Sequence, residues 1–266
     1  MSKELISMAE TIRSYSGFQG KKAIILGSGL GSLPDQFENK TIIPYEKVRG
    51  YPKTSVKGHS GEFVIGTLHG EEILAAKGRF HYYEGFDVSE ITLPIRLFHE
   101  LGIKCVLITN SAGSMRKDYS PGTFMAINGH LDCTFIDGPE DPALKKGAPF
   151  YNSSFLDLAK KCSIETGIDL KEGVYCWAMG PTYETPEEIL YFQQLGGDVV
   201  GMSTVPEIQM AAECGIKSLG ISCLTNYASG ITKEPLTHEE VIETADKVKN
   251  QFSTLVTKIL IEADTN

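Results

Sequence analysis

The segment KGRFHYYEG, residues 77–85, places an arginine and a histidine in a glycine-flanked loop that follows an apolar, strand-like run. Arg79 offers a planar fork of N–H donors that matches a phosphate group in a bidentate manner, and His81 adds a further donor. A second glycine-flanked loop, GHSGEF at 58–63, contains His59. Either histidine alone is more often a solvated residue or a core partner, but the cluster around Arg79 favours an anion site.

The segment AIILGSGLGSL, residues 23–33, ends a short apolar run in a loop of glycines and serines. The dinucleotide-binding fingerprint G-x-G-x-x-G/A is not met, because its last position counted from Gly27 is Ser32, and no Walker lysine follows. The backbone amides of the loop and the Ser28 hydroxyl suit a single anion held in a nest of N–H groups. A tight turn, in which glycine only supplies a positive φ, is an equally good interpretation of this stretch.

Further apolar runs end in small polar residues, which let a ligand approach the backbone: ITNSAGS at 108–114, VGMSTVPE at 200–207 and LTNYASG at 224–230. MGPTYETPEE at 179–188 adds an aromatic face for stacking a planar ring and an acidic acceptor for ring N–H groups. Each segment has a plain structural alternative, a strand-to-turn transition or, for Glu184, an acidic residue that complements a helix dipole. Asn226 can donate to one ring atom and accept from another.

The chain of 266 residues carries a formal net charge of −9. This balance argues against a nucleic-acid-binding surface, which neutralises phosphates with Lys and Arg, and an anionic ligand would need a local cationic pocket. The six cysteines are scattered without a C-x-x-C pair, a pattern typical of free thiols in a reducing compartment. No apolar stretch approaches the ~20 residues of a membrane span, and MSKELISMAETIRSY is typical of an amphipathic helix, not a signal peptide. We expect a cytoplasmic protein without membrane or nucleic-acid partners.

Strand-like runs recur at 23–26, 63–68, 72–77, 105–109, 174–179, 198–202 and 218–224, and several are continuous apolar runs of the kind covered on both faces. The runs at 63–68 and 72–77, joined by HGE, predict an antiparallel hairpin. Alternation with helical patterns predicts an α/β fold, a three-layer sandwich with a mixed, largely parallel twisted central sheet flanked by helices. We expect a single domain over residues 1–266, with functional residues on loops that follow the strands.

Three helix starts match a capping box, in which a threonine side chain caps the helix and a glutamate three residues later reaches back. They are TPEE at 185–188, TVPE at 204–207, whose helix has Gly215 as a stop, and THEE at 237–240. The last of these begins the clearest helix, whose apolar stripe consists of Val241, Ala245, Val248, Phe252, Leu255, Val256 and Ile259.

Together, GSGLG, GRFHYYEG, TNSAG, GPTYET and VGMSTVPE resemble the motifs of the trimeric purine nucleoside phosphorylase family, in the family's order and over nearly the whole chain. The resemblance implies the nucleoside phosphorylase fold, a homotrimer and a role in purine salvage. It implies reversible phosphorolysis: a 6-oxopurine ribonucleoside or deoxyribonucleoside, such as inosine or guanosine, reacts with inorganic phosphate to give the free purine and (deoxy)ribose 1-phosphate. Phosphate is then a co-substrate, and no metal or organic cofactor is implied.

The resemblance also implies roles for individual residues. The phosphate site comprises Ser28, His59, Arg79, His81, Ser111 and Ser203, the ribose contacts are Tyr83, Met202 and His238, and the base contacts are Tyr183, Glu184, Thr204 and Asn226. Asn226, Glu184 and His81 are the expected catalytic residues. Asn226 stabilises the negative charge that develops on the leaving purine, and Glu184 accepts a hydrogen bond from N1–H. Phosphate held below C1′ attacks the sugar directly, so positioning supplies much of the rate and no covalent enzyme intermediate is expected.

The sequence departs from the family pattern in several places. Serines at 60 and 111 stand where family members often carry alanine. GHLDC at 129–133 stands where many members have Asp-His-Ile-Asn. GAPFYNS at 147–153 stands where the family has an Arg-Phe-Pro segment whose phenylalanine enters the neighbouring subunit's site. Phe150 or Tyr151 is the candidate for that aromatic.

Four alternatives to the 6-oxopurine enzyme stay open to test. A methylthioadenosine phosphorylase would favour an acidic residue at the position of Asn226 and has no need of His238. A xanthosine-preferring phosphorylase is a closer variant of the same reaction. A non-catalytic purine- or phosphate-binding protein is an alternative of a different class. A dehydrogenase is disfavoured by the unmatched fingerprint.

Overall fold

The computed structural model describes residues 3–54, 60–233 and 238–265, without the side chains of residues 238 and 239. The elements in chain order are α1 Lys3–Ser16, β1 Lys22–Leu26, η1 Leu33–Gln36, β2 Glu38–Pro44, η2 Tyr45–Lys47, β3 Glu62–Leu68, β4 Glu71–Lys77, η3 Tyr82–Glu84, α2 Val88–Ile91, α3 Leu93–Leu101, β5 Cys105–Ser114, β6 Phe124–Asp132, β7 Lys145–Lys146, α4 Ser153–Thr166, β8 Leu170–Trp177, α5 Pro186–Gln194, β9 Val199–Gly201, α6 Val205–Glu213, β10 Lys217–Tyr227 and α7 His238–Glu262.

The strands form a mixed sheet in the order β10–β6–β8–β9–β5–β1–β4–β3–β2, with β7 beside β6. β10 also pairs with β5, so β10, β6, β8, β9 and β5 close into a ring. The parallel pairings are those of β1 with β4 and β5, of β5 with β10, and of β8 with β6 and β9. β3 and β4 form the antiparallel hairpin that the sequence predicts. The predicted mixed α/β class is therefore confirmed.

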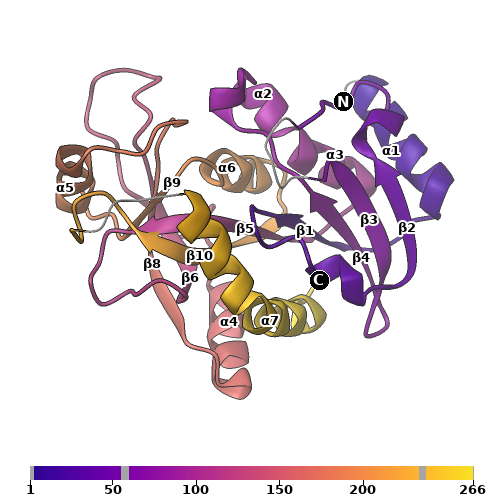
Figure 1. Ribbon diagram of the computed structural model, residues 1–266. Helices are drawn as coiled ribbons and strands as arrows, with labels where there is room; N and C mark the ends of the chain where they lie inside the picture. The colour runs from indigo at the N-terminus through magenta and orange to yellow at the C-terminus, as the bar shows by residue number, and fades with distance from the viewer. Residues whose placement is uncertain (1–2, 55–59, 234–237, 266) are drawn as a thin grey trace.

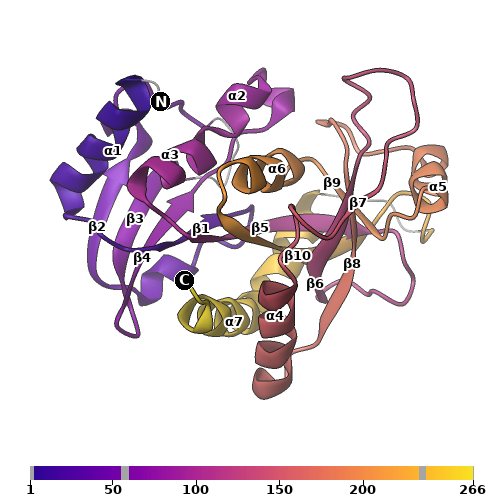
Figure 2. The same cartoon turned by 180° about the vertical axis from the view of Figure 1, so that it is seen from behind.

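Helices cover the sheet on two sides: α1, α2, α3 and α6 lie on one side, and α4 and α7 lie on the other (Figure 1; Figure 2 shows the opposite view). Strand β1 shows why both sides need cover. Ala23 and Ile25 join the apolar cluster under α1 and α3, whereas Ile24 and Leu26 join the cluster under α4 and α7. A continuous apolar run is expected of a strand buried on both faces.

Several predicted helix features are confirmed. The Thr185 side chain accepts from the Glu188 N–H, and the Glu188 carboxylate accepts from the Thr185 N–H, which completes the TPEE capping box of α5. Gly215 follows the last residues of α6 with a φ of 66°. The stripe of α7 packs into the core, where most of its members are buried. The predicted cap of α7, Thr237, lies outside the described residues.

The capping box predicted at TVPE is wrong. Thr204, the residue before α6, has φ 76° and ψ −45°, and its side chain makes no cap hydrogen bond. Its hydroxyl is instead 3.0 Å from Asn110 Nδ2 of β5, which donates to it. Glu207 turns away from its own helix end toward Arg79. This helix start is held by contacts with distant parts of the chain, which a local pattern does not reveal.

Some strands extend beyond their apolar runs. β5 and β10 pair in parallel from Cys105↔Lys217 to Ser114↔Tyr227, so the small polar residues of ITNSAGS lie in a strand rather than in a turn. β8 begins at Leu170, before the predicted 174, because Leu170 pairs with Phe124 of β6. Inter-strand hydrogen bonds, rather than composition, set these limits.

None of the helices among the described residues has both the length and the apolar character of a membrane span.

His130 on β6 is a buried histidine that predicts a pH dependence of stability. Its side chain is 1 % exposed, with Nδ1 2.7 Å from Tyr151 Oη and Nε2 3.2 Å from Gln209 Nε2. Burial, aided by the charge of Lys145, lowers the pKa of His130 from 6.5 to about 4. The unfolded chain therefore binds a proton that the folded chain does not bind between these two values.

We predict that this histidine makes the free energy of unfolding fall by about 3 kcal/mol as the pH drops from 6.5 to 4, because one pKa unit corresponds to about 1.4 kcal/mol. Denaturant unfolding of the natural chain and of His130→Gln across this range checks it. The natural chain should lose more stability than the variant, and equal pH slopes would contradict the assignment.

Candidate active site

A cavity of about 360 Å3 opens where several strands reach their carboxyl ends. It gathers residues from the loops after β1, β4 and β8, from the ends of β5, β9 and β10, and from the start of α7. Residues expected from the sequence that line it are Ser28, Arg79, His81, Tyr83, Ser111, Tyr183, Glu184, Met202, Ser203 and Asn226. Segments scattered over the whole chain thus meet at one edge of the sheet, as parallel strands require.

Among the expected site residues whose side chains the structure describes, Thr204 does not line the cavity. Thr204 is fully buried behind the wall, where it contacts Asn110 and lies 3.1 Å from the Ser203 hydroxyl. His59 lies outside the described residues, and so does the side chain of His238. Val241, in the first turn of α7, does line the cavity, so this helix start lies close to the site.

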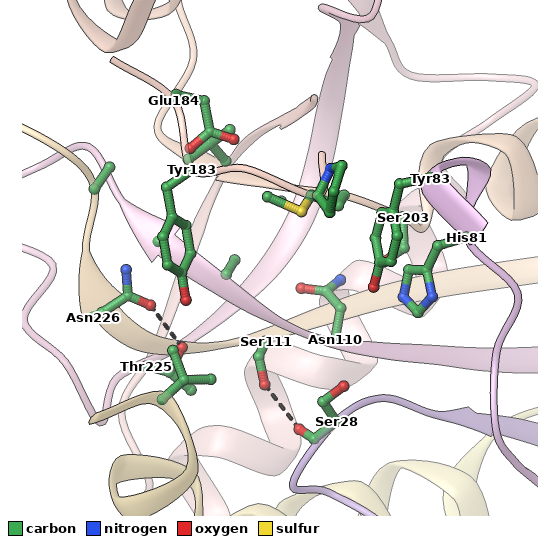
Figure 3. A pocket seen from close by; sticks show the side chains of 18 of the residues that line it. Ser28, His81, Tyr83, Asn110, Ser111, Tyr183, Glu184, Ser203, Thr225 and Asn226 are labelled. Atoms are coloured by element: carbon green, nitrogen blue, oxygen red, sulfur yellow. Dashed lines mark hydrogen bonds between the residues drawn. The ribbon is translucent and has the colours of Figure 1, made fainter. Parts of the chain in front are cut away.

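The labelled side chains divide the cavity into two ends (Figure 3). Tyr183, Glu184 and Asn226 lie on one side, while His81 and Tyr83 lie on the other. Ser28 and Ser111 lie together at the base of the view, and the Ser111 hydroxyl donates to the Ser28 carbonyl at 2.9 Å. One end is therefore rich in basic and hydroxyl groups, and the other holds an aromatic, a carboxyl and an amide.

Gly27 explains how the loop after β1 reaches this position. A Cβ at this residue would lie 2.8 Å from both the Asn110 Cα and the Thr109 carbonyl oxygen, so any larger residue would push the loop away from β5. The Gly27 N–H donates to Thr109 Oγ1 at 3.1 Å. Glycine at position 27 thus allows the loop to approach β5 closely. This close approach brings Ser28 beside Ser111.

His81 is held in place by its neighbours. Glu84 Oε1 lies 2.8 Å from His81 Nδ1 and also accepts from the His81 backbone N–H at 2.9 Å. The Tyr83 ring stacks on the imidazole, with centroids 4.8 Å apart and planes 18° apart. Burial raises the pKa of Tyr83 to about 12, so its phenol is a neutral donor near pH 7. The segment HYYE therefore presents an oriented imidazole and a hydroxyl to the cavity.

At the opposite end, Asn226 is 5 % exposed and its amide is oriented by backbone and side-chain partners. Thr225 Oγ1 donates to Asn226 Oδ1 at 2.9 Å, and Asn226 Nδ2 donates to the Tyr227 carbonyl at 2.9 Å. Gly113 makes room for this amide, since a Cβ there would lie 3.2 Å from Nδ2. The amide orientation is thus built into β5 and β10.

Glu184 supplies the acidic group of the same end. Burial raises the pKa of its carboxyl, while the Glu184 backbone N–H acts in the opposite direction and nearby Glu188 adds to the rise. A carboxylate that is partly removed from water forms stronger hydrogen bonds with a ring N–H than an exposed one does. Tyr183 beside it is 41 % exposed, and its ring points from the side of Glu184 toward Thr225 and Asn226 (Figure 3), where a planar ring can stack on it.

Sequence reasoning missed several residues of this site. Asn110 and Thr225 line the cavity, and Glu84 orients His81. These three residues lie inside motifs that the sequence singled out. The sequence therefore predicts that they lie near the site, but it does not predict which side chains they contact. Glu207 was assigned to a helix cap and instead pairs with Arg79 of the cavity wall.

The two candidates for an aromatic that crosses between subunits differ in burial. Tyr151 is 5 % exposed in its own chain, and its hydroxyl is committed to His130. Phe150 is only partly buried, with its ring centroid 5.3 Å from that of His130. Phe150 is therefore the better candidate of the two.

Candidate metal ligands do not cluster in the described part of the chain. Over residues 3–54, 60–233 and 240–265, His, Cys, Asp and Glu side chains form no group of three able to hold a metal ion. The six cysteines are free thiols.

The mixed sheet and the strand-end cavity together define an α/β protein with a ligand site at the carboxyl ends of its strands. A family model described as the phosphorylase superfamily matches residues 21–261. Purine nucleoside phosphorylase 1 of Geobacillus stearothermophilus is 43% identical over 244 residues, which cover 89% of this chain and 89% of the relative. The purine nucleoside phosphorylase of Rattus norvegicus is 33% identical over 96% of this chain and 93% of its own length.

Solved structures of purine nucleoside phosphorylases are also similar to this chain. Schistosoma mansoni purine nucleoside phosphorylase in complex with inosine superposes with a TM-score of 0.89 at 32% identity, over 98% of this chain and 97% of that chain. Schistosoma purine nucleoside phosphorylase in complex with hypoxanthine gives a TM-score of 0.88 at 32% identity, over 98% of both chains. The chain belongs to the purine nucleoside phosphorylases of the phosphorylase superfamily, as the resemblance of its motifs predicts.

Proposed function

We propose that the cavity catalyses the reversible phosphorolysis of 6-oxopurine ribonucleosides and deoxyribonucleosides by inorganic phosphate. The products are the free purine and (deoxy)ribose 1-phosphate, so the enzyme is a pentosyltransferase. The observation that carries the proposal is the division of one cavity into a hydroxyl-rich basic end and an end that holds Glu184 and Asn226. The relatives named purine nucleoside phosphorylase support it.

The basic end suits phosphate. Ser28, Arg79, His81, Ser111 and Ser203 offer hydroxyl, guanidinium and imidazole donors around one part of the cavity. Phosphate bound there lies below the sugar, stabilises the cationic character that develops at C1′ and then attacks that carbon. Holding the two reactants in this geometry converts a bimolecular reaction into an effectively unimolecular one. Tyr83, which stacks on His81, and Met202 line the cavity and are proposed to contact the ribose, and His238 is proposed to face the 5′-hydroxyl.

The other end suits a 6-oxopurine. As the C1′–N9 bond breaks, negative charge moves into the purine, and the Asn226 amide stabilises it through hydrogen bonds at O6 and N7. Glu184 as a carboxylate accepts from N1–H, and from the 2-amino group when the base is guanine. Tyr183 stacks on the ring. Thr204, expected to contact the base, is buried behind the wall beside Asn110 and Ser203, so it is not proposed as a base contact.

A substrate panel tests the reaction and its specificity. Phosphate-dependent base release should be fastest with inosine and guanosine, and kcat/KM for adenosine and methylthioadenosine should be at least about tenfold lower, because their N1 cannot donate to Glu184. Adenosine has to be included in the panel, because the structure of a Schistosoma mansoni relative has been solved in complex with adenosine. Xanthosine tests the remaining variant of the reaction.

The panel separates the alternatives. A reaction mixture without phosphate is the control and should release no base. Adenosine or methylthioadenosine as the best substrate would contradict the assigned base end. Nucleoside binding without any turnover would identify a non-catalytic binding protein.

A substitution at Asn226 tests the role of the amide. In Asn226→Asp the carboxylate repels the charge that develops on the leaving purine, so kcat/KM for inosine should fall on the order of 10²–10³-fold, as when an oxyanion donor is lost. Asn250→Asp, on the exposed face of α7, adds the same charge away from the cavity and is the control. Inosine turnover that is unchanged in Asn226→Asp would rule out the assigned role.

We also propose that the chain acts as a homotrimer of single-domain subunits. The segments between β6 and α4 carry exposed apolar side chains, among them Phe135, Ile136 and Leu144, which suit a protein interface. Phe150 lies in the same region and is proposed to reach the neighbouring site. Light scattering on the purified chain should give three times the chain mass, and the mass of a single chain at assay concentration would contradict the trimer.

Two further proposals concern cofactors and cellular location. The reaction needs no metal or organic cofactor, because phosphate is itself the nucleophile. We propose that the protein is cytoplasmic, because all six cysteines are free thiols, as is usual in a reducing compartment.

A further inference from the structure

Arg79, which lines the cavity, forms a buried ion pair with Glu207 at the start of α6. Arg79 Nε donates to Glu207 Oε1 at 3.0 Å, and Arg79 Nη2 lies 3.0 Å from Glu207 Oε2. The guanidinium is thus joined to the carboxylate by one charge-assisted hydrogen bond through Nε and by a second close charge contact, whose geometry is not that of a hydrogen bond. The two side chains are 2 % and 0 % exposed.

A third contact fixes the guanidinium from another direction. Arg79 Nη1 donates to the Thr109 carbonyl of β5 at 2.8 Å. Thr109 Oγ1 in turn donates to the Ile25 carbonyl at 3.0 Å and accepts from the Gly27 N–H at 3.1 Å. The arginine is thus held relative to the same strand that holds the loop of Ser28, so two phosphate-facing elements share one anchor.

Glu207 has no local reason to be buried. It stands in the first turn of a helix, where an exposed glutamate would complement the helix dipole or close a capping box. Here the box is absent and Thr204 adopts a φ of 76° that non-glycine residues rarely take. A fully buried carboxylate is tolerated only when a cation and hydrogen bonds compensate it. The backbone before α6 is therefore arranged so that this carboxylate reaches Arg79.

We propose that Glu207 is a positioning residue for phosphate: it holds the Arg79 guanidinium in the orientation in which it meets the co-substrate, without touching any substrate itself. This inference rests on the proposed function. The kinetic consequence is selective. Loss of the carboxylate lets the guanidinium turn, which weakens phosphate binding, whereas the nucleoside contacts at Glu184 and Asn226 are unaffected.

The first test is Glu207→Gln, which keeps the size of the side chain but places an amide N–H2 against the guanidinium donors. The KM for phosphate should rise at least about tenfold, as expected for loss of one charge-assisted hydrogen bond that orients the arginine. The KM for inosine should stay within about twofold, because uniform loss of activity would indicate damage to the fold. Glu213→Gln, on the exposed end of the same helix, is the control and should leave both constants unchanged.

Two further variants keep the test decisive if Glu207→Gln does not fold. Glu207→Asp retains a carboxylate and should recover part of the phosphate affinity. Arg79→Lys leaves Glu207 intact and keeps the charge but removes the fork. If orientation matters, its KM for phosphate rises as in Glu207→Gln, whereas an unchanged KM would show that charge alone suffices and would overturn the proposal. Thermal melting of each variant shows which of them are folded.

The outcomes separate this inference from the function on which it rests. If the natural chain shows no phosphate-dependent base release, the proposed function fails. If the natural chain is active and folded Glu207→Gln has an unchanged or lower KM for phosphate, the function stands and the positioning role fails. A lower KM would mean that Glu207 weakens phosphate binding by offsetting the arginine charge.

Discussion

The hydrogen bonds of Thr109 are the interaction on which the basic end of the cavity depends. Its hydroxyl joins the end of β1 to β5 through Ile25 and Gly27, and its carbonyl accepts from Arg79, which follows β4. Thr109 is fully buried, and its polar groups are satisfied by these three partners, as buried polar groups require. The loops that carry Ser28 and Arg79 are therefore fixed to one central strand, and their relative position is a property of the sheet rather than of the loops.

Much of this arrangement is predictable from the sequence because parallel strands end at a common edge. Small polar residues after successive apolar runs place Ser28, Ser111 and Asn226 near one another without any knowledge of side-chain contacts. Local rules also succeed where both partners are local, as in the capping box of Thr185 and Glu188. The buried faces of β1 and the stripe of α7 follow from hydrophobic periodicity alone.

The failures share one physical cause: the deciding partner is distant in sequence. Thr204 and Glu207 have the spacing of a capping box, but their hydrogen-bonding groups are taken by Asn110 and Arg79 on other elements. Likewise, β5 continues through polar residues because β10 supplies its hydrogen bonds. The strand β6 is hard to recognise because its register shifts between Ile127 and Gly129, which interrupts the alternation of side chains. Tertiary contacts override local preference in each case.

The charge balance of the cavity bears on how an acidic chain would accommodate the proposed phosphate. The net charge of −9 calls for a local cationic pocket, yet the two basic side chains described at this end each face a carboxylate: Arg79 faces Glu207, and His81 faces Glu84. Binding must then depend on oriented donors more than on excess positive charge, and preoriented dipoles are most effective where water is excluded.

Orientation by a carboxylate also suits a phosphate that has to react. In the proposed reaction, interactions that bind phosphate equally in the ground state and in the transition state do not accelerate the chemical step. Donors whose orientation is fixed before phosphate binds need no reorganisation as cationic character develops at C1′. The interaction that grows along the reaction is then the one between the phosphate and the sugar.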